Sequence, residues 1–316
     1  MKTTAALVKR NIKMFFADKG LFFTSLITPM ILLLLYITFL GNVYRDVYDQ
    51  VLGPFGISEK VINSFVASQL VSSLLAVTAV TVSFCSNMLM VQDKFQGMWQ
   101  DMKVSPVKRY IPAVAYYAAS FSVTYFICLI ATAGGFIYLA TMGWYLSALD
   151  VFLILLDVAL LVMFGTALSS LINFFLSSQG QISAVGSIVS SCYGFICGAY
   201  MPISQFPEWL QKAIAFLPGT YGTSILRNRF MRGSIAEINT QMPNAEAFKG
   251  LPSEEIEKLV DEQITLLCDS VDCNVYFFDH NMEMWQMYLV LGGFTVLILA
   301  AYILLNIFST KKIKKN

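Results

Sequence analysis

The segment from Val91 to Arg109, VQDKFQGMWQDMKVSPVKR, is a polar and basic stretch between two long apolar runs. The preceding run covers residues 65–91 and the following run covers residues 111–138, and each is long enough to cross a membrane. Charged side chains are costly to bury in hydrocarbon, so we expect the segment between the runs to lie in water. This arrangement predicts membrane-spanning helices joined by a hydrated connector.

Between Gly97 and Pro106, the connector carries an apolar set at helical spacing: Met98, Trp99, Met102 and Val104. The pattern predicts a short helix whose apolar face could press into a groove of a partner protein. Because it joins two spans, such a helix would transmit force from the partner to the spans. A solvated connector with a chance tryptophan accounts for the same composition equally well.

The composition is that of a membrane protein. Of the 316 residues, 57% are hydrophobic and only 13% are charged, whereas about a quarter of an average soluble domain is charged. This balance predicts an all-α polytopic membrane protein and excludes a soluble domain with a large core. The formal net charge of +1 indicates no particular partner.

Residues 1–19 precede the first apolar run and have two chemical faces. Apolar residues recur at helical spacing, and Lys9, Arg10 and Lys13 occupy the other side. This pattern predicts an amphipathic helix that lies in the membrane interface. A basic targeting prefix is the alternative, and it is disfavoured because the segment runs directly into a full span.

Six apolar runs are long enough to be spans: residues 21–40, 65–91, 111–138, 151–176, 182–201 and 285–308. The first five spans, with the cytoplasmic connector 92–109, occupy residues 20–232. A polar loop is expected over residues 41–64. Residues 233–284 form an extracytoplasmic insert, and residues 285–316 contain the last span and a basic tail.

The segment 202–231, which precedes the insert, contains three prolines that divide it into short pieces. Part of it is amphipathic, with Trp209 on the apolar side and Glu208 on the polar side. We expect short re-entrant helices that dip back into the outer membrane interface.

Small and polar residues follow one helix face in each of two predicted spans. They include Gln69, Ser72, Ser73 and Asn87 in the second span, and Ser187, Ser190 and Gly194 in the fifth. Polar atoms that face lipid lack hydrogen-bond partners, so both stripes should face protein or water. The stripes could line a substrate path and a seam between two subunits, or they could pack together within one subunit.

Asp157 is the only acid inside an apolar run. A carboxylate at mid-membrane costs ~3 kcal/mol, so we expect Asp157 to turn inward or to lie near the interface. An interfacial position and a functional role fit its place in the span about equally well.

Cys268 and Cys273 are the only cysteines in the polar insert. If the insert faces outward, its compartment permits oxidation. We therefore predict a disulfide between Cys268 and Cys273, with two free thiols as the alternative.

The distribution of charge predicts the orientation. Most of the 21 lysines and arginines lie in the N-terminal segment, the connector and the tail, where the acids are only Asp18, Asp93 and Asp101. By the positive-inside rule, these three regions are cytoplasmic and the acidic insert faces outward. We therefore expect a multi-pass protein of the cell membrane with both termini in the cytoplasm.

The sequence contains no evident catalytic machinery. No glycine is followed by lysine, which excludes a phosphate-binding loop of the Gly-Lys-Ser/Thr kind. No His/Cys cluster has the spacing of a metal site, and the single histidine, His280, is expected in an outer loop. We expect that the chain is not an enzyme by itself and that it binds neither a cofactor nor a metal.

Two motifs resemble those of ABC transporter permeases of the type-2 exporter family, which include multidrug and daunorubicin-type permeases. In the connector the matching residues are Val91, Asp93, Gly97, Ser105, Pro106, Val107 and Arg109. Before the last span they are Gly198, Pro202, Pro207, Trp209, Gln211, Pro218, Tyr221 and Arg227. The sequence departs from the family pattern at Phe95, Gln100 and Leu217.

The resemblance implies a partner and an energy source. A separate cytoplasmic ATPase, which carries ATP and Mg²⁺, would dock on residues 92–105, and two permease subunits would work with two ATPases. The residues implied in coupling are Asp93, Gly97, Met98, Trp99, Met102 and Pro106. The expected function is outward movement of an amphiphile such as a drug, lipid or peptide.

Two other functions remain open from the sequence. An ion-coupled secondary transporter or channel usually has several ionisable groups at membrane depth, and here only Asp157 is available. A membrane anchor or sensor whose outer insert binds a ligand is the third possibility.

Overall fold

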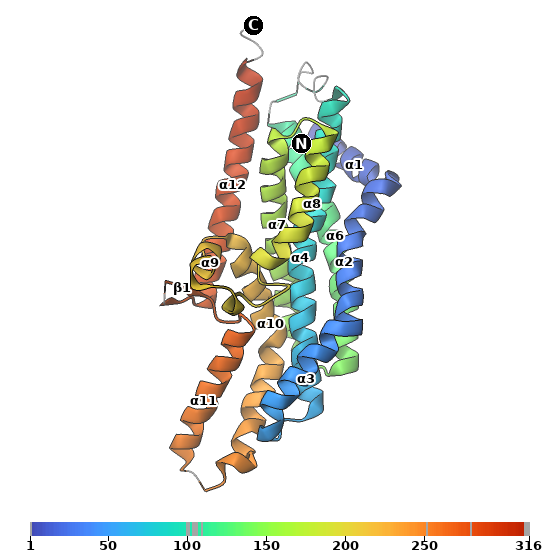
Figure 1. The fold of residues 1–316 in the computed structure, drawn as a ribbon. Coiled ribbons are helices and arrows are strands. Elements are labelled where there is room, and N and C mark those ends of the chain that lie inside the picture. Colours follow the sequence, from blue (N-terminus) through green and yellow to red (C-terminus); the bar gives the residue numbers. More distant parts are fainter. Residues whose placement is uncertain are drawn as a thin grey trace.

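The computed structural model describes residues 2–98, 102, 107–108, 110–250, 252–278 and 280–312. In this part of the chain nearly all residues are helical, and the main helices run along one long axis (Figure 1). The long helices are α1 Lys2–Ala17, α2 Lys19–Leu35, α3 Gly41–Leu52, α4 Glu59–Phe95, α6 Ile111–Met142, α7 Ala148–Phe175, α8 Gln179–Ile196, α10 Pro218–Gln241, α11 Ser253–Ser270 and α12 Met284–Lys312.

Short elements complete the fold. They are the π-helix Tyr36–Leu40, the 3₁₀ turns Gly53–Phe55, Ile203–Gln205, Met242–Asn244 and Glu246–Phe248, helix α9 Glu208–Ile214, and strands β1 Tyr276–Phe277 and β2 His280–Asn281. The two strands pair antiparallel, with Tyr276 opposite Asn281. The expected all-α membrane architecture is therefore confirmed, with one small hairpin added.

Five helices in the described part are long and apolar enough to cross a membrane: Lys19–Phe55, Glu59–Phe95, Ile111–Met142, Ala148–Phe175 and Met284–Phe308. The sixth expected span corresponds to α8, which has 18 residues and is rich in serine and glycine. At 1.5 Å per residue, α8 is about 27 Å long, close to the ~30 Å of a hydrocarbon core. The six-span topology stays a prediction.

Helix α4 is the centre of the molecule. Its 37 residues extend about 55 Å, and it packs against α2, α6, α7, α8 and α10. Nearly all of its side chains are buried, including its serines and threonines. A helix that is covered on every side belongs to the protein core rather than to the lipid boundary.

The prediction of a polar loop over residues 41–64 is wrong, because most of this segment is helical. The first span continues through the π-helix into α3, and α4 begins at Glu59. Helix α3 is amphipathic and buries Tyr48 and Leu52, and the Tyr48 ring lies edge-on to Phe65 of α4 with centroids 5.0 Å apart. Packing of this apolar face keeps a polar segment helical, which the hydropathy pattern alone does not indicate.

The segment 202–231, predicted to form short re-entrant helices, contains short elements in its first part and the start of a long helix in its second part. Helix α9 has seven residues, but α10 then runs for 24 residues through the expected boundary at 232. The segment 202–231 and the insert 233–284 are therefore joined by a continuous helix. Beyond it, α10 and α11 extend away from the end of the molecule that carries the N and C termini (Figure 1).

Candidate functional site

The C-terminal end of α4, where the predicted connector begins, is fixed to three neighbouring helices. Asp93 lies in the last turn of α4 and its side chain is 0% exposed. Its carboxylate accepts a hydrogen bond from Arg10 of α1, with Nη1 and Oδ2 2.8 Å apart, and another from the Tyr116 hydroxyl of α6. The Asp93 side chain therefore offers no surface to a partner in this structure, and its role in coupling stays a prediction.

Arg10 also reaches Met98, one of the predicted coupling residues beyond the end of α4. Its Nη2 lies 3.4 Å from the sulfur of Met98, and its Nη1 donates to Asn11 at 2.9 Å. The hydrogen bond that Arg10 donates to Asp93 raises the pKa of Arg10, so the guanidinium keeps its charge. Helix α1 is thus tied to the beginning of the connector, a relationship that no local sequence pattern indicated.

Lys94 joins the same end of α4 to α7. Its ammonium donates to the carbonyl oxygens of Asn173 at 3.1 Å and Phe174 at 2.6 Å. These carbonyls are at the C-terminal end of α7, where helical carbonyls lack intrahelical partners and a cation is favourable. The connector therefore leaves the membrane core from a helix end that is anchored on α1, α6 and α7.

The remaining predicted coupling residues lie beyond this anchored end. Gly97 has a φ of +83° and no neighbour within 4 Å of the position of an added Cβ. Met98 and Met102 are half-buried, and Met102 packs on a cluster that includes Tyr116 and Tyr302. Trp99 and Pro106 lie outside the described residues, so their role in docking stays a prediction.

The polar stripe of the second predicted span packs inside one subunit. Gln69, Ser72, Ser73 and Asn87 are at most 2% exposed. The Asn87 amide donates to Ser169 Oγ at 2.6 Å and to Ser170 Oγ at 2.9 Å, both on α7. Helix α4 is enclosed by its own neighbours, which favours the alternative that this stripe packs within one subunit.

The stripe of the fifth span is divided between two environments. Gly194 is buried, and a Cβ there would meet the ring of Tyr200 at 2.2 Å, so it is covered within its own subunit. Ser190 is half-buried and Ser187 is exposed. Of the three predicted residues, Ser187 and Ser190 are therefore placed where a substrate or a second subunit could reach them.

A groove of about 640 Å³ lies between α2 and α8, with part of α4 as its floor. Its polar lining includes Thr24 and Thr28 of α2, Ser187 and Ser190 of α8, and Gln92 of α4. The sequence analysis did not identify the α2 residues, because isolated threonines in an apolar run are ordinary. Paired hydroxyls along an open groove can bind an amphiphilic ligand or pack against another helix.

At the other end of the bundle, three arginines of α10 each pair with an acid outside α10. Arg232 lies 2.9 Å from Asp150 at the start of α7. Arg229 lies 3.4 Å from Asp157 of α7, and the Tyr288 hydroxyl of α12 also donates to Asp157. Asp157 is therefore neutralised by an ion pair between helices.

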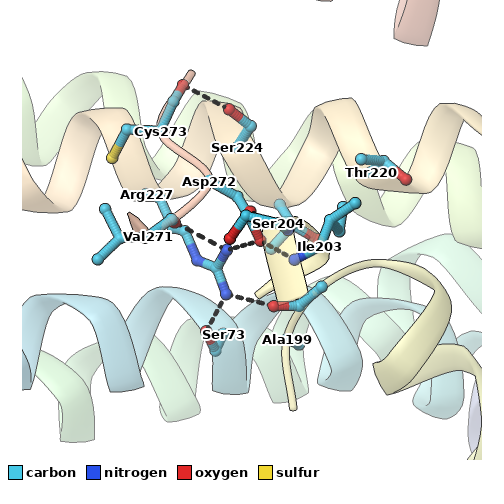
Figure 2. Close-up of polar contacts among 12 residues, drawn as sticks. Ser73, Ala199, Ile203, Ser204, Thr220, Ser224, Arg227, Val271, Asp272 and Cys273 are labelled. Atoms are coloured by element: carbon cyan, nitrogen blue, oxygen red, sulfur yellow. Dashed lines mark hydrogen bonds and ion pairs between the residues drawn. The ribbon is translucent and has the colours of Figure 1, made fainter. Parts of the chain in front are cut away.

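The third arginine, Arg227, is the centre of the network in Figure 2. It is 1% exposed, and its guanidinium reaches Asp272 Oδ2 and Ser73 Oγ, each at 3.0 Å, and the carbonyls of Val271 and Gly198. Asp272 in turn accepts from the Ile203 backbone N–H at 2.8 Å. Residues from α4, α10, the turn after α8 and the end of α11 converge on this one side chain.

The second sequence motif has a structural role in the same region. Gly198 accepts from Arg227, the Gln211 amide donates to the Phe206 carbonyl at 2.7 Å, and the Tyr221 hydroxyl donates to Ala215 at 2.6 Å. These bonds satisfy backbone groups in irregular segments, which would otherwise be costly to bury. The motif therefore maintains the shape of the turn between α8 and α10.

Cys268 and Cys273 are adjacent at the end of α11, and both thiols are free in this structure. The Cys273 N–H donates to the Cys268 carbonyl at 2.9 Å. Contact with Cys273 lowers the pKa of Cys268, which favours the thiolate that begins disulfide formation. The disulfide itself stays a prediction.

Within the described residues, no group of three or more His, Cys, Asp and Glu side chains could hold a metal ion. Comparison with known proteins shows that the family model described as ABC-2 type transporter matches residues 3–231 of this chain. That range includes the connector and the turn between α8 and α10. No curated protein matches the sequence.

Proposed function

The chain belongs to the ABC-2 type transporter family as a membrane permease subunit, and we propose that it is the permease of an ATP-driven exporter for an amphiphilic drug, lipid or peptide. The family implies a cytoplasmic ABC ATPase as partner and the lipid bilayer as environment. The permease is not itself catalytic, and hydrolysis of ATP with Mg²⁺ is assigned to the partner.

The observation that carries this proposal is the anchoring of the connector on the central helix. The connector leaves α4 directly after Asp93 and Lys94, which bind α1, α6 and α7. A displacement of the connector by an ATPase would therefore act on four helices at once. Because α4 is buried along its length, it could pass that displacement to the outer end of the bundle.

The groove between α2 and α8 is the best candidate for the substrate path. It combines hydroxyl groups with apolar walls, as an amphiphile requires. One side of it is open, and α8 exposes Ser187 and Ile188 there. We propose that a second permease subunit closes the groove, so that the transporter contains two permeases and two ATPases.

Alternating access in this pair would begin with the ATPases. Their closure on ATP would push the two connectors together and move each α4 against its α7 and α8. The groove would then open toward the outer end, which α10 and α11 form. The outward direction follows from the resemblance to type-2 exporters, and the cytoplasmic position of both termini from the positive-inside rule.

The ion-coupled alternative is weakened by a specific contact. Such a transporter needs an ionisable group at membrane depth that changes charge or ligand during the cycle. Asp157 is the only acid in an apolar run, and it pairs with Arg229 and accepts from Tyr288. This arrangement is that of a structural ion pair.

Two measurements test the proposal. Inside-out vesicles that contain the protein and its co-purifying ATPase should accumulate a fluorescent lipophilic dye when ATP and Mg²⁺ are added, and a protonophore should not prevent it. Trp99→Ala should reduce ATPase co-purification, because buried aromatics often contribute ~2 kcal/mol or more to an interface. Dye uptake that needs an ion gradient but no ATP would support the secondary transporter instead.

A further inference from the structure

A second and larger groove lies at the end of the bundle that carries the N-terminus. Its volume is about 900 Å³, and it is bounded by α1 and by the residues just before and at the start of α6. The side chains used below are Val8, Lys9, Ile12 and Lys13 of α1, with Lys108 and Ile111. Figure 1 shows α1 beside the end of α6, at the level where the connector meets the bundle.

The α1 side of this groove consists of two parallel rows. Val8 and Ile12 are four residues apart and form an apolar row, with Thr4 one turn before them. Lys9 and Lys13 form a cationic row one residue further along the same face. An apolar row beside a cationic row matches a molecule with an acyl chain and an anionic group.

The three lysines of the groove are available for such an anion. In the part of the chain that the structure describes, Lys9, Lys13 and Lys108 are exposed and make no ion pair, whereas the nearby Arg10 is paired with Asp93. Acids among the described lining residues are absent. The groove therefore has an uncompensated positive charge over an apolar wall.

From these observations we propose that the groove binds one anionic phospholipid, with its phosphate between Lys9, Lys13 and Lys108 and an acyl chain along Val8, Ile12 and Ile111. A lipid is preferred over a soluble phosphate compound because Ile111 begins a helix long and apolar enough to cross a membrane and lines the same groove as Val8 and Ile12. Basic pockets between helices near the membrane surface are typical sites for anionic headgroups.

The bound lipid would join α1 to the point where the connector returns to the membrane. Arg10 already joins α1 to the point where the connector leaves α4. With both contacts present, α1 would hold the two ends of the connector at a constant separation. This inference concerns lipid binding alone and does not depend on the transport proposal.

The test uses the full-length protein, purified in detergent, with phosphatidylglycerol as the probe and phosphatidylcholine as the neutral lipid. Native mass spectrometry counts the bound lipid. We expect one phosphatidylglycerol to be retained in preference to phosphatidylcholine. The double variant Lys9→Gln/Lys13→Gln should bind it roughly 30-fold more weakly, as removal of two lysines near an anionic headgroup predicts, and Lys9→Arg/Lys13→Arg should restore binding.

The matched control is Lys2→Gln/Lys19→Gln, which removes the same charge from exposed positions outside the groove and should leave binding unchanged. Equal loss in both double variants would indicate general surface attraction and overturn the proposal. Equal retention of the two lipids would also overturn it. Displacement of the lipid by equimolar glycerol 3-phosphate would assign the groove to soluble phosphates, against a lipid site.

Discussion

Arg10 of α1 and Asp93 of α4 are 83 positions apart in the sequence, and their side chains form an ion pair of 2.8 Å at the end of the central helix. Asp93 is fully buried, while Arg10 is 30% exposed. The pair connects the N-terminal helix α1 to α4, the helix from which the connector emerges. It therefore links α1 to the proposed site of coupling.

We expect Arg10→Gln to destabilise the protein by about 2 kcal/mol, because it leaves the buried carboxylate of Asp93 without its cation. The double variant Arg10→Gln/Asp93→Asn should be less destabilised than Arg10→Gln, since it removes the unpaired charge. Thermal unfolding in detergent measures both. If the double variant is as unstable as the sum of the single variants, the ion pair is not the relevant interaction.

Gly97→Ala should weaken ATP-driven transport without preventing membrane insertion. The φ of +83° at Gly97 is in the left-handed region, where any other residue is strained by about 1 kcal/mol or more. Gly97→Pro should have a larger effect. The matched control is Gly134→Ala on α6, where an added Cβ meets nothing within 4 Å and φ is ordinary; a similar loss in that variant would refute the argument from backbone strain.

Cysteine cross-linking should identify the surface between two subunits. In a background without native cysteines, Ser187→Cys on α8 should cross-link to a second permease. Ser72→Cys should not cross-link, because Ser72 on α4 is buried inside the helix bundle. Ile137→Cys on α6 is 69% exposed and serves as an accessible control. Cross-links through Ile137 but not Ser187 would place the interface elsewhere and remove the α2–α8 groove from the substrate path.

Substitutions of the α10 arginines should differ in severity according to burial. Arg227→Gln should cost about 3–5 kcal/mol of stability, because it leaves Asp272 buried and unpaired. Arg232→Gln should cost about 0–1 kcal/mol, since the Arg232 side chain is 59% exposed and its ion pair is screened by water. Equal shifts in the melting temperature of the two variants would contradict this ranking.

The Cys268–Cys273 disulfide should form if the insert that carries both cysteines faces an oxidising compartment. The Cys273 N–H already donates to the Cys268 carbonyl at 2.9 Å, and contact with Cys273 lowers the pKa of Cys268, which favours the attacking thiolate. Mass spectrometry of peptides from the non-reduced protein measures the bond. Two alkylated cysteines in protein isolated under non-reducing conditions would show that the thiols remain free.

Hydropathy and motif spacing alone were enough to determine several features of this protein. The apolar runs predict the membrane helices because the free energy of transfer of a 20-residue segment depends on its own composition. The connector motif and the Gly198–Arg227 motif indicated the family, which the match over residues 3–231 confirmed. The amphipathic pattern of the first residues likewise predicted α1.

Only the tertiary structure decided how the polar side chains are used. Polarity predicted that Ser72 and Asn87 avoid lipid, but it did not distinguish a subunit seam from the interior, and packing of α7 against α4 places both residues in the interior. Asp93, which was expected at a docking surface, lies in an ion pair with Arg10. Asp157, which was expected to turn inward or to lie near the interface, pairs with Arg229. Such pairs join residues far apart in the chain, so they depend on which helices become neighbours, and local composition does not encode that.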